Sequence, residues 1–133
     1  MASRAERLGK LLHLQQRIKQ VHETRRAGFL AASAKALEEV EDLRQRSDAA
    51  DSLSSVFPAL YSKHIAEALD RSARERQKAE AEAKQVATAT IRANRVEQQY
   101  REAQALEERH AEDRERLDMI EQQRPQARSA DAD

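Results

Sequence analysis

Apolar residues recur at helical spacing along most of the chain, as a narrow line between polar and charged residues. In the first half they stand three and four residues apart, first in a heptad rhythm typical of a coiled-coil seam. The rhythm then changes to an eleven-residue repeat, which straightens or slightly reverses a supercoil. The predicted seam of this half comprises Leu11, Leu14, Ile18, Val21, Arg25, Phe29, Ala32, Ala36, Val40 and Leu43.

The second half carries a weaker line of the same kind, with an alanine-rich middle. Between Pro58 and Pro125 there is no glycine or proline, and most residues are among those that lose least on entering a helix. At 1.5 Å per residue, one helix over this stretch would reach about 99 Å and would need a partner along its length. Its predicted seam comprises Tyr61, Ile65, Leu69, Ala73, Ala79, Ala83, Val86, Ala89, Ala93, Val96, Tyr100, Ala103 and Leu106.

Capping and turn residues divide the chain into two helices. Ser3 followed by Glu6 forms a capping box, which predicts a helix start near Arg4. The Ser- and Asp-rich stretch before Pro58 predicts a turn, with Ser54 or Ser55 capping the second helix. The predicted fold is all-α, an antiparallel coiled-coil hairpin over 1–124 with helices at about 4–46 and 58–123, a turn at 47–57 and a disordered tail at 125–133.

Two local features refine this prediction. Gly28 lies inside the first predicted helix beside alanines, so we expect it to permit close helix contact rather than to end the helix. Arg124-Pro125 is expected to close the second helix, because proline lacks the backbone N–H that a helix interior uses.

Composition excludes several classes of function. The 133 residues contain 24 basic and 24 acidic side chains, so no global field favours nucleic acid, and the basic residues have no interleaved aromatics for base stacking. No cysteine is present, which excludes disulfides and is compatible with a reducing compartment. No continuous apolar run predicts a secretory signal or an integral membrane segment.

Catalytic motifs are also missing from the sequence. Glycine occurs only at Gly9 and Gly28, so no phosphate-cradling loop is predicted, and no serine or threonine pairs recognisably with a histidine. Glu107 and His110 have the Glu-x-x-His spacing of di-iron bundles, but such a site needs a second motif, and a chance match is the better interpretation. We therefore predict a protein that is not an enzyme and has no cofactor, metal or catalytic residue.

The two ends of the predicted hairpin differ chemically. Residues 1–30 hold seven basic and two acidic side chains, whereas 104–123, an overhang of roughly 20 residues, hold three basic and seven acidic ones. Large apolar residues gather at the turn, where they either cap the hairpin core or stay exposed to dock a partner. This turn cluster is Leu53, Val56, Phe57, Leu60 and Tyr61.

The chain resembles the FliJ/YscO-type stalk proteins of flagellar and virulence type III export. The N-terminal RAERLGKLLHLQQRIKQV is similar to the opening of that family, and the Glu-rich RANRVEQQYREAQALEERHAEDRERLDMIEQQ to its closing segment. That segment ends in a Leu-Asp pair, here Leu117-Asp118. The family usually continues with another acidic residue, whereas Met119-Ile120 intervene here.

This resemblance implies a hairpin like the central stalk of rotary ATPases, in a cytoplasmic component of bacterial flagellum biogenesis, motility and protein transport. It implies partners in a hexameric export ATPase, the cytoplasmic domain of the export gate and export chaperones, with peripheral attachment to the inner membrane through the apparatus. The implied gate-facing residues are Phe57, Leu60, Tyr61 and Ile65. The implied ATPase-facing residues are Arg4, Arg7, Lys10, Arg114 and Arg116.

A second hypothesis remains open, a structural coiled-coil protein that self-associates and has no ATPase partner. The stalk hypothesis predicts an elongated monomer, because the two helices satisfy each other's seams. A stable dimer or tetramer would favour self-association.

Overall fold

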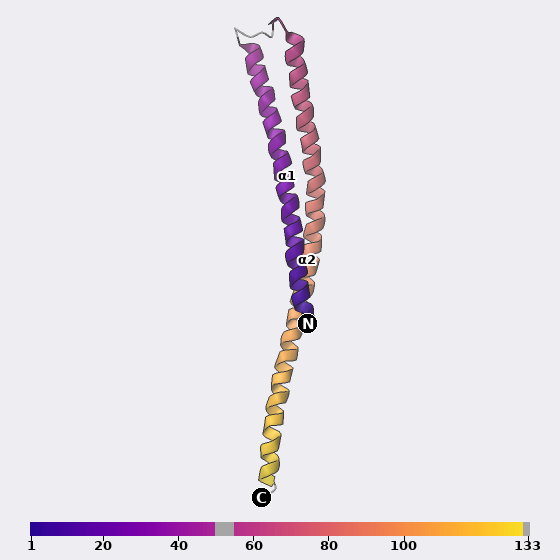
Figure 1. Ribbon diagram of the computed structural model, residues 1–133, viewed down its shortest axis with the longest axis vertical. Helices are drawn as coiled ribbons and strands as arrows, with labels where there is room; N and C mark the ends of the chain where they lie inside the picture. The colour runs from indigo at the N-terminus through magenta and orange to yellow at the C-terminus, as the bar shows by residue number, and fades with distance from the viewer. Residues whose placement is uncertain (50–54, 132–133) are drawn as a thin grey trace. The chain divides into compact units, whose positions relative to one another are not determined.

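The computed structural model describes residues 1–49 and 55–131, with side chains described as far as Arg124 (Figure 1). Two helices account for nearly all of it, α1 (Arg4–Asp48) and α2 (Pro58–Asp131). They pack against each other in antiparallel directions, and the described residues contain no strand. The predicted all-α helical hairpin is confirmed.

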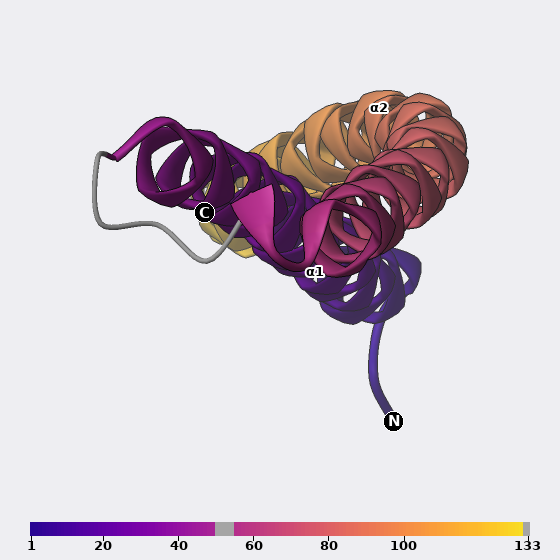
Figure 2. The ribbon, with the colours of Figure 1, turned by 90° about the horizontal axis from the view of Figure 1, so that it is seen from above.

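The contacts between α1 and α2 divide into two units, one of residues 1–15 with 92–133 and one of residues 16–91. In the second unit Ser33 meets Ser72 and His22 meets Glu82, so partner numbers fall on α2 as they rise on α1. In the first unit Ala5 meets Glu107, again in the antiparallel sense. The view from above also shows α1 beside α2 (Figure 2).

The helix starts follow the local sequence signals. Ser3 Oγ accepts a hydrogen bond from the Glu6 N–H at 3.1 Å, as the capping box predicts. Pro58 is the first residue of α2, where its fixed φ suits the first helical turn. α1 ends at Asp48, close to its predicted end. Residues 50–54, including the predicted cap Ser54, lie outside the described residues.

The predicted end of α2 is wrong. The helix continues through Pro125 to Asp131 instead of closing at Arg124, so 125–131 are helical rather than a disordered tail. A proline inside a helix removes one backbone hydrogen bond, and such a helix kinks or ends depending on its context. Residues 132–133 lie outside the described residues.

The seam of α1 keeps one heptad phase from Ala5 to Leu43, with only the position of Arg26 exposed, and this corrects the predicted stripe. Leu11, Leu14, Ile18 and Val21 lie beside the buried seam, with exposed fractions of 40, 53, 37 and 49%. Arg25 and Ala32 are exposed as well, and no eleven-residue repeat appears in the burial pattern. The buried and half-buried seam positions are Ala5, Leu8, Leu12, Gln15, Lys19, His22, Phe29, Ser33, Ala36, Val40 and Leu43.

α1 is one continuous helix, so the residues that face α2 at one end determine which residues can face it at the other end. Phe29, Ala36 and Val40 lie against α2. A heptad rhythm carried back from them along one continuous helix reaches Leu12 and Gln15. The predicted stripe stands one residue away, about 100° around the helix, and therefore cannot face α2 at the same time.

The predicted α2 seam is mostly right. Its heptad rhythm runs from Tyr61 to Glu107 and includes the weak alanine-rich middle. Three predicted members, Leu69, Ala73 and Leu106, are exposed. The adjacent residues Ala68, Ser72 and Glu107 occupy their places.

Small side chains fill the buried seam of the described residues. Val40, 3% exposed, is the largest apolar side chain that is buried, and most of the others are alanines. Alanine brings little apolar area into a contact, so each residue of this seam contributes less than a leucine would. Outside this seam many large apolar residues stay partly in water.

The close contact expected at Gly28 is found at Gly9 instead. A Cβ placed on Gly28 would meet nothing within 4 Å, so the expected close approach at this residue is wrong. A Cβ placed on Gly9 would lie 3.1 Å from Cε2 of Tyr100, so the close approach occurs there instead. The Tyr100 ring takes the space that a side chain at position 9 would need.

Candidate interaction surfaces

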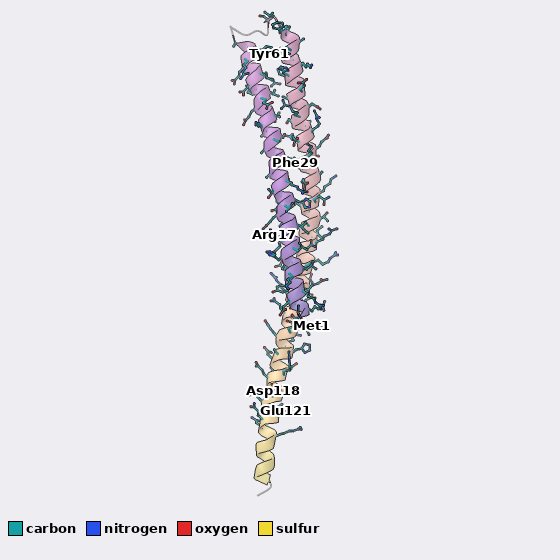
Figure 3. The ribbon with its side chains drawn as sticks, in the orientation of Figure 1. Met1, Arg17, Phe29, Tyr61, Asp118 and Glu121 are labelled. Carbon is teal, nitrogen blue, oxygen red and sulfur yellow. The ribbon has the colours of Figure 1, made fainter. Side chains whose placement is uncertain are left out.

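The turn-end surface, Phe57, Leu60, Tyr61 and Ile65, lies on the first two turns of α2 and the residue before them. Phe57 and Leu60 are about half exposed, at 53 and 49%, whereas Tyr61 and Ile65 are half-buried at seam positions. Figure 3 shows Tyr61 at the turn end of α2. The surface therefore divides into two residues that pack on α1 and two that face water.

A hollow of about 210 Å³ lies in this surface. Phe57, Leu60 and Tyr61 form its apolar side with Leu43 of α1. Its rim carries the basic side chain Arg46 and the imidazole of His64. A hollow with apolar walls and a cationic rim suits an apolar side chain of a partner next to a carboxylate. Leu53, the remaining member of the predicted turn cluster, lies outside the described residues.

The terminal-end surface, Arg4, Arg7, Lys10, Arg114 and Arg116, is exposed throughout. Arg4 shares a hollow of about 370 Å³ with Leu106 and Arg109 of α2, among other residues. Arg114 lines a second hollow with Ser3 and Glu107.

The five residues of this surface do not form one cluster. Arg116 pairs with Asp113 at 3.9 Å on its own helix. Arg7 and Lys10 line neither of the two hollows. The structure thus brings Arg4 and Arg114 to the start of α1 and leaves the other three along the helices.

Glu107 joins the start of α1 to α2. Its Oε1 accepts a hydrogen bond from the Ala5 N–H at 3.3 Å. The first N–H groups of a helix have no partner within the helix, and a carboxylate also complements the positive end of the helix dipole. Ser3, which directly precedes α1, and Glu107, which lies on α2, together cap the start of α1.

Beyond Glu107, no described residue of α2 is buried or half-buried, although Arg109 and Arg114 still line the hollows at Arg4 and Ser3. We call residues 108–131 the α2 extension. Every side chain from Glu108 to Arg124 is exposed, including Leu117, Met119 and Ile120 at 58, 61 and 53%. Figure 3 shows Asp118 and Glu121 on this part of α2, past the N-terminus of α1. The predicted overhang is therefore present.

The seam also contains polar pairs that the apolar pattern did not reveal. His22 Nδ1 lies 2.6 Å from Glu82 Oε2, with both side chains mostly buried. Ser33 Oγ donates to the Ser72 carbonyl at 3.1 Å and lies 2.9 Å from Ser72 Oγ, and both serines are buried. The sequence signal that could have found the α1 members, His22 and Ser33, is their heptad spacing from Ala36 and Val40.

Within 1–49 and 55–131, no three histidine or acidic side chains gather as metal ligands, and Glu107 makes the α1 contact described above. Among the same residues, no helix is long and apolar enough to cross a bilayer.

Comparisons with known protein families, with curated proteins and with solved structures found no match for this chain.

Proposed function

We propose that this chain is a non-enzymatic coiled-coil component of the flagellar type III export apparatus. In this role it is the stalk of a hexameric export ATPase and a general escort for export chaperones, linking the ATPase to the export gate from the cytoplasmic side. The proposal starts from the family resemblance of the N- and C-terminal segments. The fold is compatible with it, because two unequal antiparallel helices are what the resemblance implies.

The observation that carries the proposal is the α2 extension. Every described side chain of this charged helix is exposed, so that it can contact another protein. Residues 104–123 contain seven acidic and three basic side chains, so the surface has many sites for charge complementarity. The turn-end surface, with its hollow beside Phe57 and Leu60, supplies a second and chemically different contact for the gate.

The proposal is tested with the full chain and the export ATPase of the same organism, by co-sedimentation and ATP turnover. We expect binding with raised turnover, and a stimulation at least about tenfold weaker in Arg114→Glu/Arg116→Glu, since charge reversal at an interface opposes its complementarity. Arg76→Glu is the matched control, because Arg76 is also exposed on α2 but lies within residues 16–91.

Absence of binding at tens of micromolar, with circular dichroism unchanged, would remove the stalk proposal. The second candidate, a self-associating structural coiled coil, is favoured by the exposed apolar residues of the α2 extension, which a further copy could cover. Molar mass from light scattering separates the two, because the stalk proposal expects a monomer and self-association expects a dimer or tetramer.

A further inference from the structure

One face of α1 carries four large apolar side chains that stay partly exposed beside the seam with α2. Leu11, Leu14, Ile18 and Val21 follow one another at intervals of three, four and three residues, with exposed fractions between 37 and 53%. We call them the α1 stripe. An apolar line at heptad spacing is the surface that one helix presents to another in a coiled coil. Four such residues in one line differ from scattered exposed apolar residues, which are common on any protein.

Basic residues surround the α1 stripe. Arg4 and Arg7 continue its line toward the N-terminus, and Arg25 continues it toward the C-terminus, at the same spacing. Lys10 and Arg17 flank it on the side away from the α2 seam, and Arg17 is marked on α1 in Figure 3. All five are exposed, and none forms an ion pair with a described residue. Their charges are therefore available to a partner.

We propose that the α1 stripe is a docking site for an acidic amphipathic helix of another protein. Heptad-spaced apolar residues of that helix cover Leu11, Leu14, Ile18 and Val21, and its flanking Asp and Glu side chains pair with the surrounding cations. The apolar line at heptad spacing indicates that the partner is a helix, and the surrounding basic residues indicate that this helix is acidic. Residues 1–30 carry seven basic and only two acidic side chains, so a basic helix is repelled and an acidic one is attracted.

This inference goes beyond the proposed function. It uses neither the turn-end surface nor the α2 extension, and three of its cations, Arg4, Arg7 and Lys10, also belong to the terminal-end surface. The experiment below contains no ATPase, so its outcome and that of the turnover assay are independent.

The probe is a labelled synthetic helix of about three heptads, with leucine at the core positions and glutamate on both flanks. Its binding to the full chain is followed by fluorescence anisotropy at low ionic strength. A second peptide, with every glutamate replaced by lysine, is the matched probe. We expect the acidic peptide to bind at least about tenfold more tightly and to weaken as salt is added, because salt screens surface charges.

Substitutions then locate the site. Leu14→Gln/Ile18→Gln removes apolar contact at the centre of the α1 stripe, and both residues are exposed, so the helices should remain intact. We expect this variant to lose at least about tenfold in affinity for the acidic peptide, because the apolar area of two side chains leaves the contact. Ile91→Gln is the control, since Ile91 is an exposed apolar residue of α2, at 62%.

Three outcomes would overturn the inference. Equal binding of the two peptides would show that charge does not select the partner. Unchanged binding by Leu14→Gln/Ile18→Gln would place the peptide elsewhere on the chain. A chain that is dimeric alone, and that becomes monomeric with this double substitution, would assign the α1 stripe to a second copy, whose acidic α2 extension also has exposed apolar residues.

Discussion

Two glycines of α1 differ in what they face. Gly9 faces the ring of Tyr100 and has no room for a further carbon without a shift of that ring, whereas Gly28 faces open space. Both glycines are inside α1, so both have the same intrinsic cost relative to alanine, about 1 kcal/mol. Their surroundings differ, and a matched pair of substitutions therefore separates helix propensity from packing.

We expect Gly28→Ala to raise the free energy of unfolding by about 1 kcal/mol, since it adds a better helix former without a clash. Gly9→Ala should gain clearly less, because the new Cβ lies 3.1 Å from Tyr100 Cε2 and the ring must move. Thermal melts followed by circular dichroism measure both. Equal stabilisation by the two substitutions would show that the ring of Tyr100 gives way without cost.

At the scale of the element, α1 has two candidate apolar faces. One contains Phe29, Ala36 and Val40 and is half-buried or buried, and the other is the α1 stripe and is exposed. The alanine-rich seam of α2 approaches the first face and leaves the second in water. The seam also includes the hydrogen-bonded serines Ser33 and Ser72, whose hydroxyls would lose their partners in another register.

Two valines on α1 test this assignment with the same substitution. Val40 is 3% exposed and Val21 is 49% exposed. We expect Val40→Asp to lower the free energy of unfolding by roughly 2–4 kcal/mol, because it buries a charge without a partner. Val21→Asp should change it by less than about 0.5 kcal/mol, as exposed substitutions usually do. A larger loss at Val21 in a denaturant titration would contradict the observed phase of α1.

At the scale of the whole molecule, one part of α2 packs against α1 and another part does not. Residues up to Glu107 of α2 pack against α1, whereas no described side chain of the α2 extension is buried and only its first residues lie beside Ser3 and Arg4. Most of the stability of helices in proteins comes from packing, and the α2 extension has little packing of this kind. The two parts of α2 should therefore differ in stability although they share one continuous helix.

Amide hydrogen exchange measures this difference. We expect amides of 112–124 to exchange roughly a hundredfold or more faster than those of 33–43, because opening the unpartnered helix breaks no tertiary contact. The same comparison in the presence of the export ATPase should slow exchange in 112–124 if the stalk proposal holds. Similar protection of both segments in the isolated chain would mean that another molecule covers the α2 extension.

Local signals in the sequence were sufficient for the helices, for the cap at Ser3, for the start of α2 at Pro58 and for most of the α2 seam. These features depend on propensity, capping and one dominant apolar line, all of which act within a few residues. The tertiary structure alone decided the phase of α1, the close contact of Gly9 with Tyr100 and the capping of Ala5 by Glu107. The physical reason is that two lines on α1, one residue apart, both satisfy helical periodicity, and only the side chains of α2 select between them.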